Sequence, residues 1–136
     1  MELRKIRKVG LALFKDKKVI MVRSHNNAEV FYFAGGTVEG GETDQECLSR
    51  EISEELSVEL DETSLTFLCE FEAPAHGKEN TVGNIRLYQA EIIGTPVPSQ
   101  EIVEIQYFDS TVDPKHLSAL ALDFAFPWLK EHGYIG

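Results

Sequence analysis

The alternation of hydrophobic and polar residues near the N-terminus predicts two strands joined by a tight turn. In the segment from Lys5 to Phe14, Val9 and Leu11 stand two positions apart, which places them on one face of an extended strand. Residues 15–17 are polar and predict a turn, and Lys18 to Arg23 predicts the returning strand. We therefore expect a β-hairpin here.

Further along the chain, hydrophobic runs alternate with polar and glycine- or proline-rich segments. Residues 24–29 read as a polar loop, and an apolar run at 30–33 leads into a glycine-rich stretch. Three more strands are predicted at residues 65–71, 85–92 and 102–108. A flexible loop is expected at 74–84 and a proline-stiffened connection at 94–98.

A helix is predicted in the middle of the chain. Thr43 and Glu46 have the spacing of a capping box, so the helix should begin at Asp44. Its apolar stripe consists of Cys47, Leu48, Ile52 and Leu56. This stripe should press the helix onto a sheet.

A second helix is predicted near the C-terminus. Asp113 fits an N-cap, with Pro114 at the first helical position. The apolar stripe that follows consists of Leu117, Leu120, Ala121, Phe124 and Trp128. Pro127 should break or kink this helix and leave two short pieces.

Three glutamates crowd one face of the central helix. Glu51, Glu54 and Glu55 stand at i, i+3 and i+4, so their Cβ atoms lie about 5–6 Å apart. Their mutual repulsion favours a bound cation, and carboxylate oxygens favour Mg²⁺ or Mn²⁺. The alternative is a solvated acidic helix on which Arg50 forms ordinary surface pairs with Glu46 and Glu54.

The spacing of these residues resembles the signature of the Nudix hydrolases. That signature is a glycine, a glutamate six positions later, and then Arg-Glu followed by two further glutamates. The matching residues are Gly36, Glu42, Arg50, Glu51, Ile52, Glu54, Glu55 and Val58. Ser57 stands where the family has a glycine. If the helix ends there in a left-handed conformation, the serine carries a steric penalty.

The resemblance implies both a fold and an activity. The fold is of the α/β (α+β) class, an α/β/α sandwich with a mixed sheet, and the activity is hydrolysis of a nucleoside diphosphate linked to another group. Glu51, Glu54, Glu55 and the carbonyl of Gly36 would hold Mg²⁺ or Mn²⁺. Arg50, paired with Glu42, would hold the glutamates in place.

The resemblance also suggests residues outside the signature. Glu101, in a segment similar to a loop of MutT-like nucleoside triphosphatases, is the favoured base that deprotonates water, with Glu104 as the alternative. Arg23 ends a strand where MutT-like proteins often have a phosphate-binding cation. Tyr32 and Phe33 are candidates to stack on a base, although core packing is an equal alternative for Phe33.

Composition limits the remaining possibilities. With 136 residues, 43% of them hydrophobic and 26% charged, the chain is expected to form one domain over residues 1–136. No apolar run is long enough to cross a membrane, so a cytoplasmic location is the default. The net charge of −10 argues against binding of duplex nucleic acid. Cys47 and Cys69 are expected to be buried residues rather than a disulfide pair.

The favoured hypothesis is a nucleoside triphosphate pyrophosphohydrolase, acting on an ordinary or oxidised nucleotide and releasing monophosphate and pyrophosphate. ADP-ribose, dinucleoside polyphosphates and nucleotide sugars are alternative substrates, and Pro74 is a weak indication of the first. A catalytically silent nucleotide-sensing module is the non-enzymatic alternative. The partner is a small nucleotide, and the family also forms homodimers. The four histidines lack zinc-binding spacing.

Overall fold

The computed structural model describes residues 2–26, 29–74 and 78–136. Its strands are β1 (Arg4–Ala12), β2 (Phe14–Lys15), β3 (Lys18–Ser24), β4 (Gly35–Thr37), β5 (Glu59–Leu60), β6 (Thr66–Pro74), β7 (Thr81–Gln89), β8 (Ile92–Ile93) and β9 (Ile102–Phe108). Its helices are α1 (Asp44–Leu56) and α2 (Phe126–Glu131), with 3₁₀ turns η1 (Glu62–Ser64) and η2 (Pro114–His116) and a π-helical turn η3 (Ala121–Ala125).

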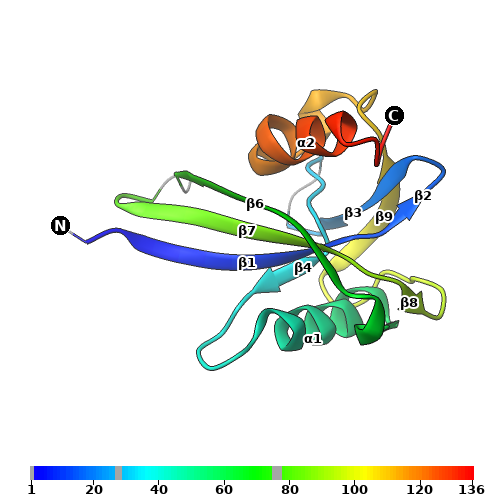
Figure 1. Cartoon of the computed structure of the whole chain (residues 1–136), viewed down its shortest axis with the longest axis horizontal. Helices are drawn as coiled ribbons and strands as arrows, with labels where there is room; N and C mark the ends of the chain where they lie inside the picture. Colours follow the sequence, from blue (N-terminus) through cyan, green and yellow to red (C-terminus); the bar gives the residue numbers. More distant parts are fainter. Residues whose placement is uncertain (1, 27–28, 75–77) are drawn as a thin grey trace.

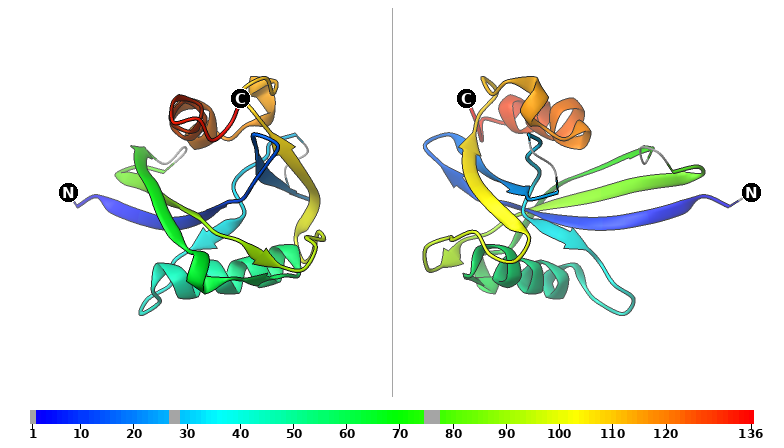
Figure 2. Two further views of the ribbon diagram at one scale, coloured as in Figure 1. Left: turned by 45° about the vertical axis from the view of Figure 1, so that its right-hand side comes forward. Right: turned by 180° about the vertical axis from the view of Figure 1, so that it is seen from behind.

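The strands form a layer between the two helices. One sheet has the order β4-β1-β7-β6, with β1 parallel to β7 and the other pairs antiparallel. A second sheet has the order β2-β3-β9, and β5 pairs with β8. Figures 1 and 2 show α1 on one side of the strands and α2 on the other. The expected α+β fold, an α/β/α sandwich with a mixed sheet, is confirmed.

The predicted N-terminal hairpin is much shorter than expected. Of the predicted first strand, only β2 pairs with β3, around a turn in which Asp16 and Lys17 have φ angles of 53° and 60°. β1 instead runs parallel to β7, from Arg4 opposite Thr81 to Ala12 opposite Gln89. Alternation determines which face of a strand is buried, but it does not determine the neighbouring strand. The hairpin prediction was therefore wrong for most of β1.

Both ends of the predicted flexible loop at 74–84 belong to strands. Pro74 is the last residue of β6, and β7 already begins at Thr81; residues 75–77, which include His76, lie outside the described residues. Asn84, 1% exposed, donates hydrogen bonds to Glu70 and Glu72. These bonds allow a polar residue inside a strand that looks like a loop in the sequence.

Helix α1 begins and ends as predicted. The Thr43 hydroxyl accepts a hydrogen bond from the Glu46 N–H at 3.1 Å, and the Glu46 carboxylate accepts one from the Thr43 N–H at 3.0 Å. All four residues of the predicted stripe are fully buried, including Cys47. Ser57 follows with φ 56° and ψ 37°. The left-handed helix end is therefore present, with serine in the place of glycine.

The start of the C-terminal helix was predicted wrongly. Asp113 caps only the turn η2, and Leu117 returns to an extended conformation and forms a β-bridge with Phe31. Helical structure resumes later as η3 and α2. Pro127 is the second residue of α2 and follows the π-helical turn η3 directly, so it lies inside a helical stretch that runs from 119 to 131. The expected division into two short pieces at Pro127 is therefore not found, because the helical backbone continues through this residue.

The hydrophobic core has two parts, one on each side of the strands. Ile20, Val22 and the stripe of α1 belong to the part under α1, while Met21, Leu87 and Leu129 belong to the part under α2. Cys69, 7% exposed, is buried in the latter. Among the described residues no helix is long and apolar enough to cross a bilayer.

Candidate active site

Two glycines allow β4 to approach α1 closely. Gly35 has a φ of +147°, and a Cβ on this residue would lie 2.0 Å from the carbonyl oxygen of Val9. A Cβ on Gly36 would lie 2.4 Å from the Cδ atom of Glu51. The position of Gly35 therefore requires glycine, whereas a side chain at Gly36 would displace the Glu51 carboxylate; the glycine pair brings the backbone of β4 against the carboxylates of α1.

Glu55 is a buried carboxylate at this contact. Its side chain accepts a hydrogen bond from the Gly35 N–H at 2.9 Å, and the residue is only 3% exposed. Desolvation, reinforced by the negative charges of Glu51 and Glu101, raises the pKa of Glu55 to about 8, although the Gly35 hydrogen bond opposes the shift. The protein therefore does not offset the cost of burying the ionised Glu55 carboxylate, and a nearby positive charge would stabilise this form.

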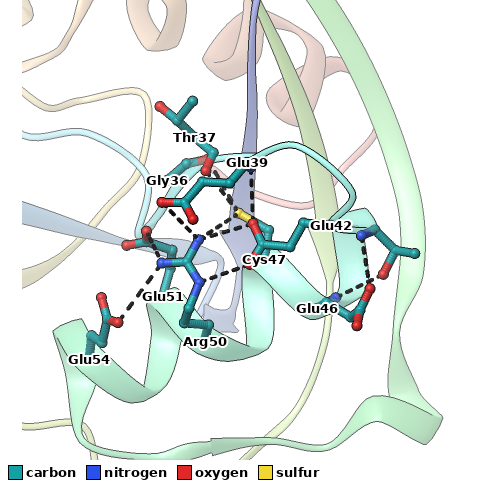
Figure 3. A network of polar contacts seen from close by, with 10 residues as sticks. Gly36, Thr37, Glu39, Glu42, Glu46, Cys47, Arg50, Glu51 and Glu54 are labelled. Atoms are coloured by element: carbon teal, nitrogen blue, oxygen red, sulfur yellow. Dashed lines mark hydrogen bonds and ion pairs between the residues drawn. The ribbon is translucent and has the colours of Figure 1, made fainter.

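Arg50 connects the glycine-rich loop to the glutamates of α1 (Figure 3). Its Nε and Nη2 atoms donate to both oxygens of Glu42 at 2.9 and 3.0 Å, and Nη1 donates to Glu51 at 2.9 Å. The more exposed Glu54 lies 3.9 Å from Nη1. Hydrogen bonding to Arg50 lowers the pKa of Glu42 to about 2. Glu46 serves the helix cap, so the alternative surface pair with Arg50 does not form.

A depression of about 380 Å³ collects several of the predicted site residues. It is lined by Lys8, Tyr32, Gly35, Gly36, Thr37, Glu39, Glu51, Glu55 and Glu101. Glu51 and Glu55 come from the signature helix, whereas Glu101 comes from the segment before β9. The pKa of Glu51 is also raised, chiefly by desolvation. The depression is therefore a mostly acidic site.

The segment that carries Glu101 is anchored to the end of α1. The Ser99 N–H donates to the carbonyl of Glu55 at 3.0 Å, and the Val97 N–H donates to that of Leu56 at 2.9 Å. The backbone carbonyl of Glu101 accepts a hydrogen bond from the His25 N–H at 3.1 Å. These contacts fix the backbone on both sides of the depression, so a residue distant in sequence joins the motif glutamates.

Glu104 and Arg23 lie elsewhere and bind each other. Arg23 Nε and Nη2 both lie 2.9 Å from Glu104 Oε1, and Gln106 donates to Glu104 Oε2 at 2.9 Å. These hydrogen bonds, that of Gln106 foremost, lower the pKa of Glu104. Neither Arg23 nor Glu104 lines the depression. The structure thus brings Glu101 rather than Glu104 to the motif glutamates.

The two aromatic candidates have different surroundings. Tyr32 lines the depression, and desolvation followed by the charge of Glu55 raises the pKa of Tyr32 to about 12, which keeps its hydroxyl protonated. Phe33 is only 6% exposed and packs against Phe126 in the core, with ring centroids 6.3 Å apart. Tyr32 is therefore accessible to a ligand in the depression, and Phe33 is not.

The N-terminus of α1 is held by a second ion pair. Arg86 on β7 donates to both oxygens of Asp44 at 2.6 and 2.5 Å, and the Tyr88 hydroxyl donates to Asp44 at 2.6 Å. These contacts, with the hydrogen bond to Arg86 foremost, lower the pKa of Asp44. Together with Arg50 and the 97–101 segment, they fix the position of the helix that carries the glutamates.

The acidic residues fit a divalent cation in their chemistry. Glu51 and Glu55 are oxygen donors with disfavoured ionised forms, and Gly36 has no Cβ that would keep a cation from its carbonyl. Within the described part of the chain, no three acidic, histidine or cysteine side chains already form a ligand cage. Arg50 and the Gly35 N–H each donate to the Oε1 atom of one carboxylate, Glu51 and Glu55 respectively.

Four residues of the depression were not anticipated from the sequence. They are Lys8, Gly35, Thr37 and Glu39. Thr37 and Glu39 lie inside the span of the signature, so the signature could have indicated that they lie near the site. Lys8 had no such signal, because its position next to β4 depends on strand pairing.

Comparison with known proteins identifies the family. The family model described as the NUDIX domain matches residues 4–124. The chain belongs to the Nudix family. Its predicted class, a hydrolase of the Nudix type, is thereby confirmed, as is action on nucleoside diphosphate derivatives as the general reaction. No curated protein matches the sequence at a significant level.

Solved structures share the Nudix fold at low sequence identity. A MutT NUDIX hydrolase from Burkholderia pseudomallei has a TM-score of 0.77 and 20% identity, over 93% of this chain and 98% of that one. The E. coli ORF135 protein has a TM-score of 0.74 and 20% identity, over 96% and 94%. A UDP-X diphosphatase has a TM-score of 0.73 and 20% identity, over 100% and 67%.

Proposed function

We propose that this Nudix protein is a metal-dependent pyrophosphohydrolase that converts a nucleoside triphosphate, ordinary or oxidised, to the monophosphate and pyrophosphate. The observation that carries the proposal is the meeting of Glu51, Glu55 and Glu101 beside the backbone of Gly36 in one depression. Such a cluster suits a polyphosphate only when cations balance its charge. The ligand set of the proposal is Glu51, Glu54, Glu55 and the Gly36 carbonyl, with Mg²⁺ or Mn²⁺.

When held by these residues, the metal would supply positive charge for the phosphate oxygens and a site for the attacking water, which the acidic depression cannot supply alone. Glu101 accepts the proton of the water. The water oxygen bonds to the α-phosphorus, the bond from that phosphorus to the bridging oxygen breaks, and pyrophosphate leaves. Arg50 holds Glu51 in place through its simultaneous contact with Glu42.

Tyr32 supports a nucleotide substrate from the same depression. It lies beside the glutamates and presents an aromatic ring with a protonated hydroxyl. Such a ring provides a stacking surface for a base and a hydrogen-bond donor for an acceptor on the substrate. Arg23 remains a proposed phosphate ligand that would first have to leave Glu104.

The test is a hydrolysis assay with a nucleotide panel in Mg²⁺ or Mn²⁺. The panel contains the common and oxidised nucleoside triphosphates, ADP-ribose, dinucleoside polyphosphates and a UDP-linked sugar; the similarity to a UDP-X diphosphatase is the reason for the last. We expect a nucleoside triphosphate to have the highest kcat/KM, with loss of turnover in EDTA. No hydrolysis of any member would refute the proposed function.

Variants assign the roles within the site. Glu54→Gln should lose most of the activity if Glu54 is a metal ligand, while Glu59→Gln, at an exposed position after α1, should remain active. Glu101→Gln should lower kcat by about a hundredfold, within the range of general base catalysis, and Glu104→Gln should have little effect. The reverse order for Glu101 and Glu104 would refute the choice of base.

A further inference from the structure

Lys8 stands at the edge of the acidic depression without a structural role of its own. In the pairing of β1 with β4, Lys8 lies opposite Thr37, and the next pair along the two strands is Val9 with Gly36. Thr37 is the last residue of β4, and the Val38 N–H still donates to the Arg7 carbonyl at 2.8 Å, so the backbone of Lys8 is paired on this side. Lys8 is solvent-exposed and lines the depression with Glu51, Glu55 and Glu101.

The charge of Lys8 is available to a ligand. Of the described residues that line the depression, Lys8 is the sole basic one, and it forms no ion pair with another described residue. Arg50, on the neighbouring helix, is already bound to Glu42 and Glu51. A lysine on a flexible stem beside an acidic site is suited to bind a phosphate oxygen as a point charge.

The strand that carries Lys8 keeps it in a fixed position relative to the glutamates. β1 pairs with β4 on one side and with β7 along its whole length on the other. The carbonyl of Val9, the residue after Lys8, packs against Gly35. The Gly35 N–H in turn donates a hydrogen bond to the Glu55 carboxylate. Lys8 is therefore carried by a strand that is paired on both sides, at the depression that Glu51, Glu55 and Glu101 also line.

We propose that Lys8 binds the leaving phosphates of the substrate and so makes the site selective for a substrate whose leaving group is pyrophosphate. This inference rests on the proposed function. A terminal pyrophosphate presents more negative charge to the Lys8 ammonium than the phosphate of a sugar does. Loss of this contact should therefore affect nucleoside triphosphates more than nucleotide sugars or ADP-ribose.

The experiment measures binding of the two product types rather than turnover. The Kd values of inorganic pyrophosphate and of AMP are determined by titration calorimetry in Mg²⁺, for the wild type, Lys8→Gln, Lys8→Arg and Lys130→Gln. Lys130 is exposed on α2 and provides a matched change of charge far from the depression. Thermal unfolding of each variant verifies that it is folded.

We expect Lys8→Gln to raise the Kd of pyrophosphate by about tenfold, the usual effect of losing one contact to a charged group, and to leave the Kd of AMP within about twofold. Lys8→Arg should retain most of the affinity, and Lys130→Gln should match the wild type. The proposal is overturned if pyrophosphate does not bind, if Lys8→Gln leaves its Kd unchanged, or if both ligands weaken equally. An enzyme that hydrolyses triphosphates but gives one of these results would refute the role of Lys8 and leave the proposed function standing.

Discussion

The guanidinium of Arg50 holds both oxygens of the Glu42 carboxylate, at 2.9 and 3.0 Å, and still donates to Glu51 at 2.9 Å. Glu42 belongs to the loop before α1, and Glu51 belongs to the helix itself. The three residues thus tie the loop to the face of the helix that carries the site. The planar fork of arginine is what makes three simultaneous contacts possible.

Replacement of the Arg50 guanidinium should lower activity without a comparable loss of stability. We expect Arg50→Lys to lower kcat by about ten- to a hundredfold, because a lysine cannot hold Glu42 with two parallel bonds and also fix Glu51. The free energy of unfolding should change little, since Arg50 is partly exposed. Steady-state kinetics and urea unfolding measure the two effects. Arg7→Lys, at an exposed position on β1, is the matched control; full activity of Arg50→Lys would contradict the prediction.

Glu55 should lower the stability of the metal-free protein and should be necessary for its activity. Because its pKa is raised to about 8, Glu55 must take up a proton when the chain folds at neutral pH. Glu55→Gln removes this cost and can retain the hydrogen bond from the Gly35 N–H through its amide oxygen. We expect the free energy of unfolding in EDTA at neutral pH to rise by about 1–3 kcal/mol, while hydrolysis falls to a small fraction of the wild-type rate. Urea unfolding and the nucleotide assay measure these changes. A destabilised Glu55→Gln variant would show that the buried charge is compensated.

The residue after α1 offers a gain in stability without a change in activity. Ser57 has φ 56°, a conformation in which glycine avoids the steric penalty of a side chain. Ser57→Gly should therefore raise the free energy of unfolding by about 0.5–1 kcal/mol, and kcat/KM should stay constant. Thermal and urea unfolding provide the measurement. Ser57→Ala should give no such gain, and equal stabilisation by both substitutions would exclude backbone strain as the cause.

The ion pair of Asp44 with Arg86 should make stability depend on acidic pH. Because the folded-state pKa of Asp44 lies below its usual value of 3.8, the pair stabilises the fold above about pH 4. This contribution is lost as pH falls through the lowered pKa. Asp44→Asn should therefore lower the free energy of unfolding by about 2 kcal/mol near neutrality, and the difference from wild type should shrink in acid.

Urea unfolding across the acid range measures this difference. Asp123→Asn, an exposed residue in η3, is the control and should change stability little at any pH. A difference between wild type and Asp44→Asn that remains constant down to the lowest pH would contradict the assignment of the effect to Asp44.

The features that the sequence predicted well are local ones. The capping box, the buried stripe of α1 and the shared face of the three glutamates all follow from helical spacing, which is independent of the rest of the chain. The position of Gly36 could also be predicted, because the signature has a fixed length. The family assignment rests on this same segment and is confirmed.

The incorrect predictions concern contacts between distant segments. The sequence predicted that β1 would pair with β3 in a hairpin, whereas β1 pairs in parallel with β7. β7 starts at Thr81, within the predicted loop, because Asn84 finds partners on β6. Asp113 caps a short turn, because Leu117 then bridges to Phe31. In each case a local signal was present, and a nonlocal partner determined the outcome.

The same distinction applies to the site. The sequence alone determined which helix carries the carboxylates, since i, i+3 and i+4 spacing places them on one face whatever the surrounding fold. The tertiary structure decided that Glu101 and Lys8 join Glu51 and Glu55 in the depression and that Glu104 pairs with Arg23. The physical reason is that sheet register and loop anchoring bring together residues separated by many positions, and no periodicity within one segment records those pairings.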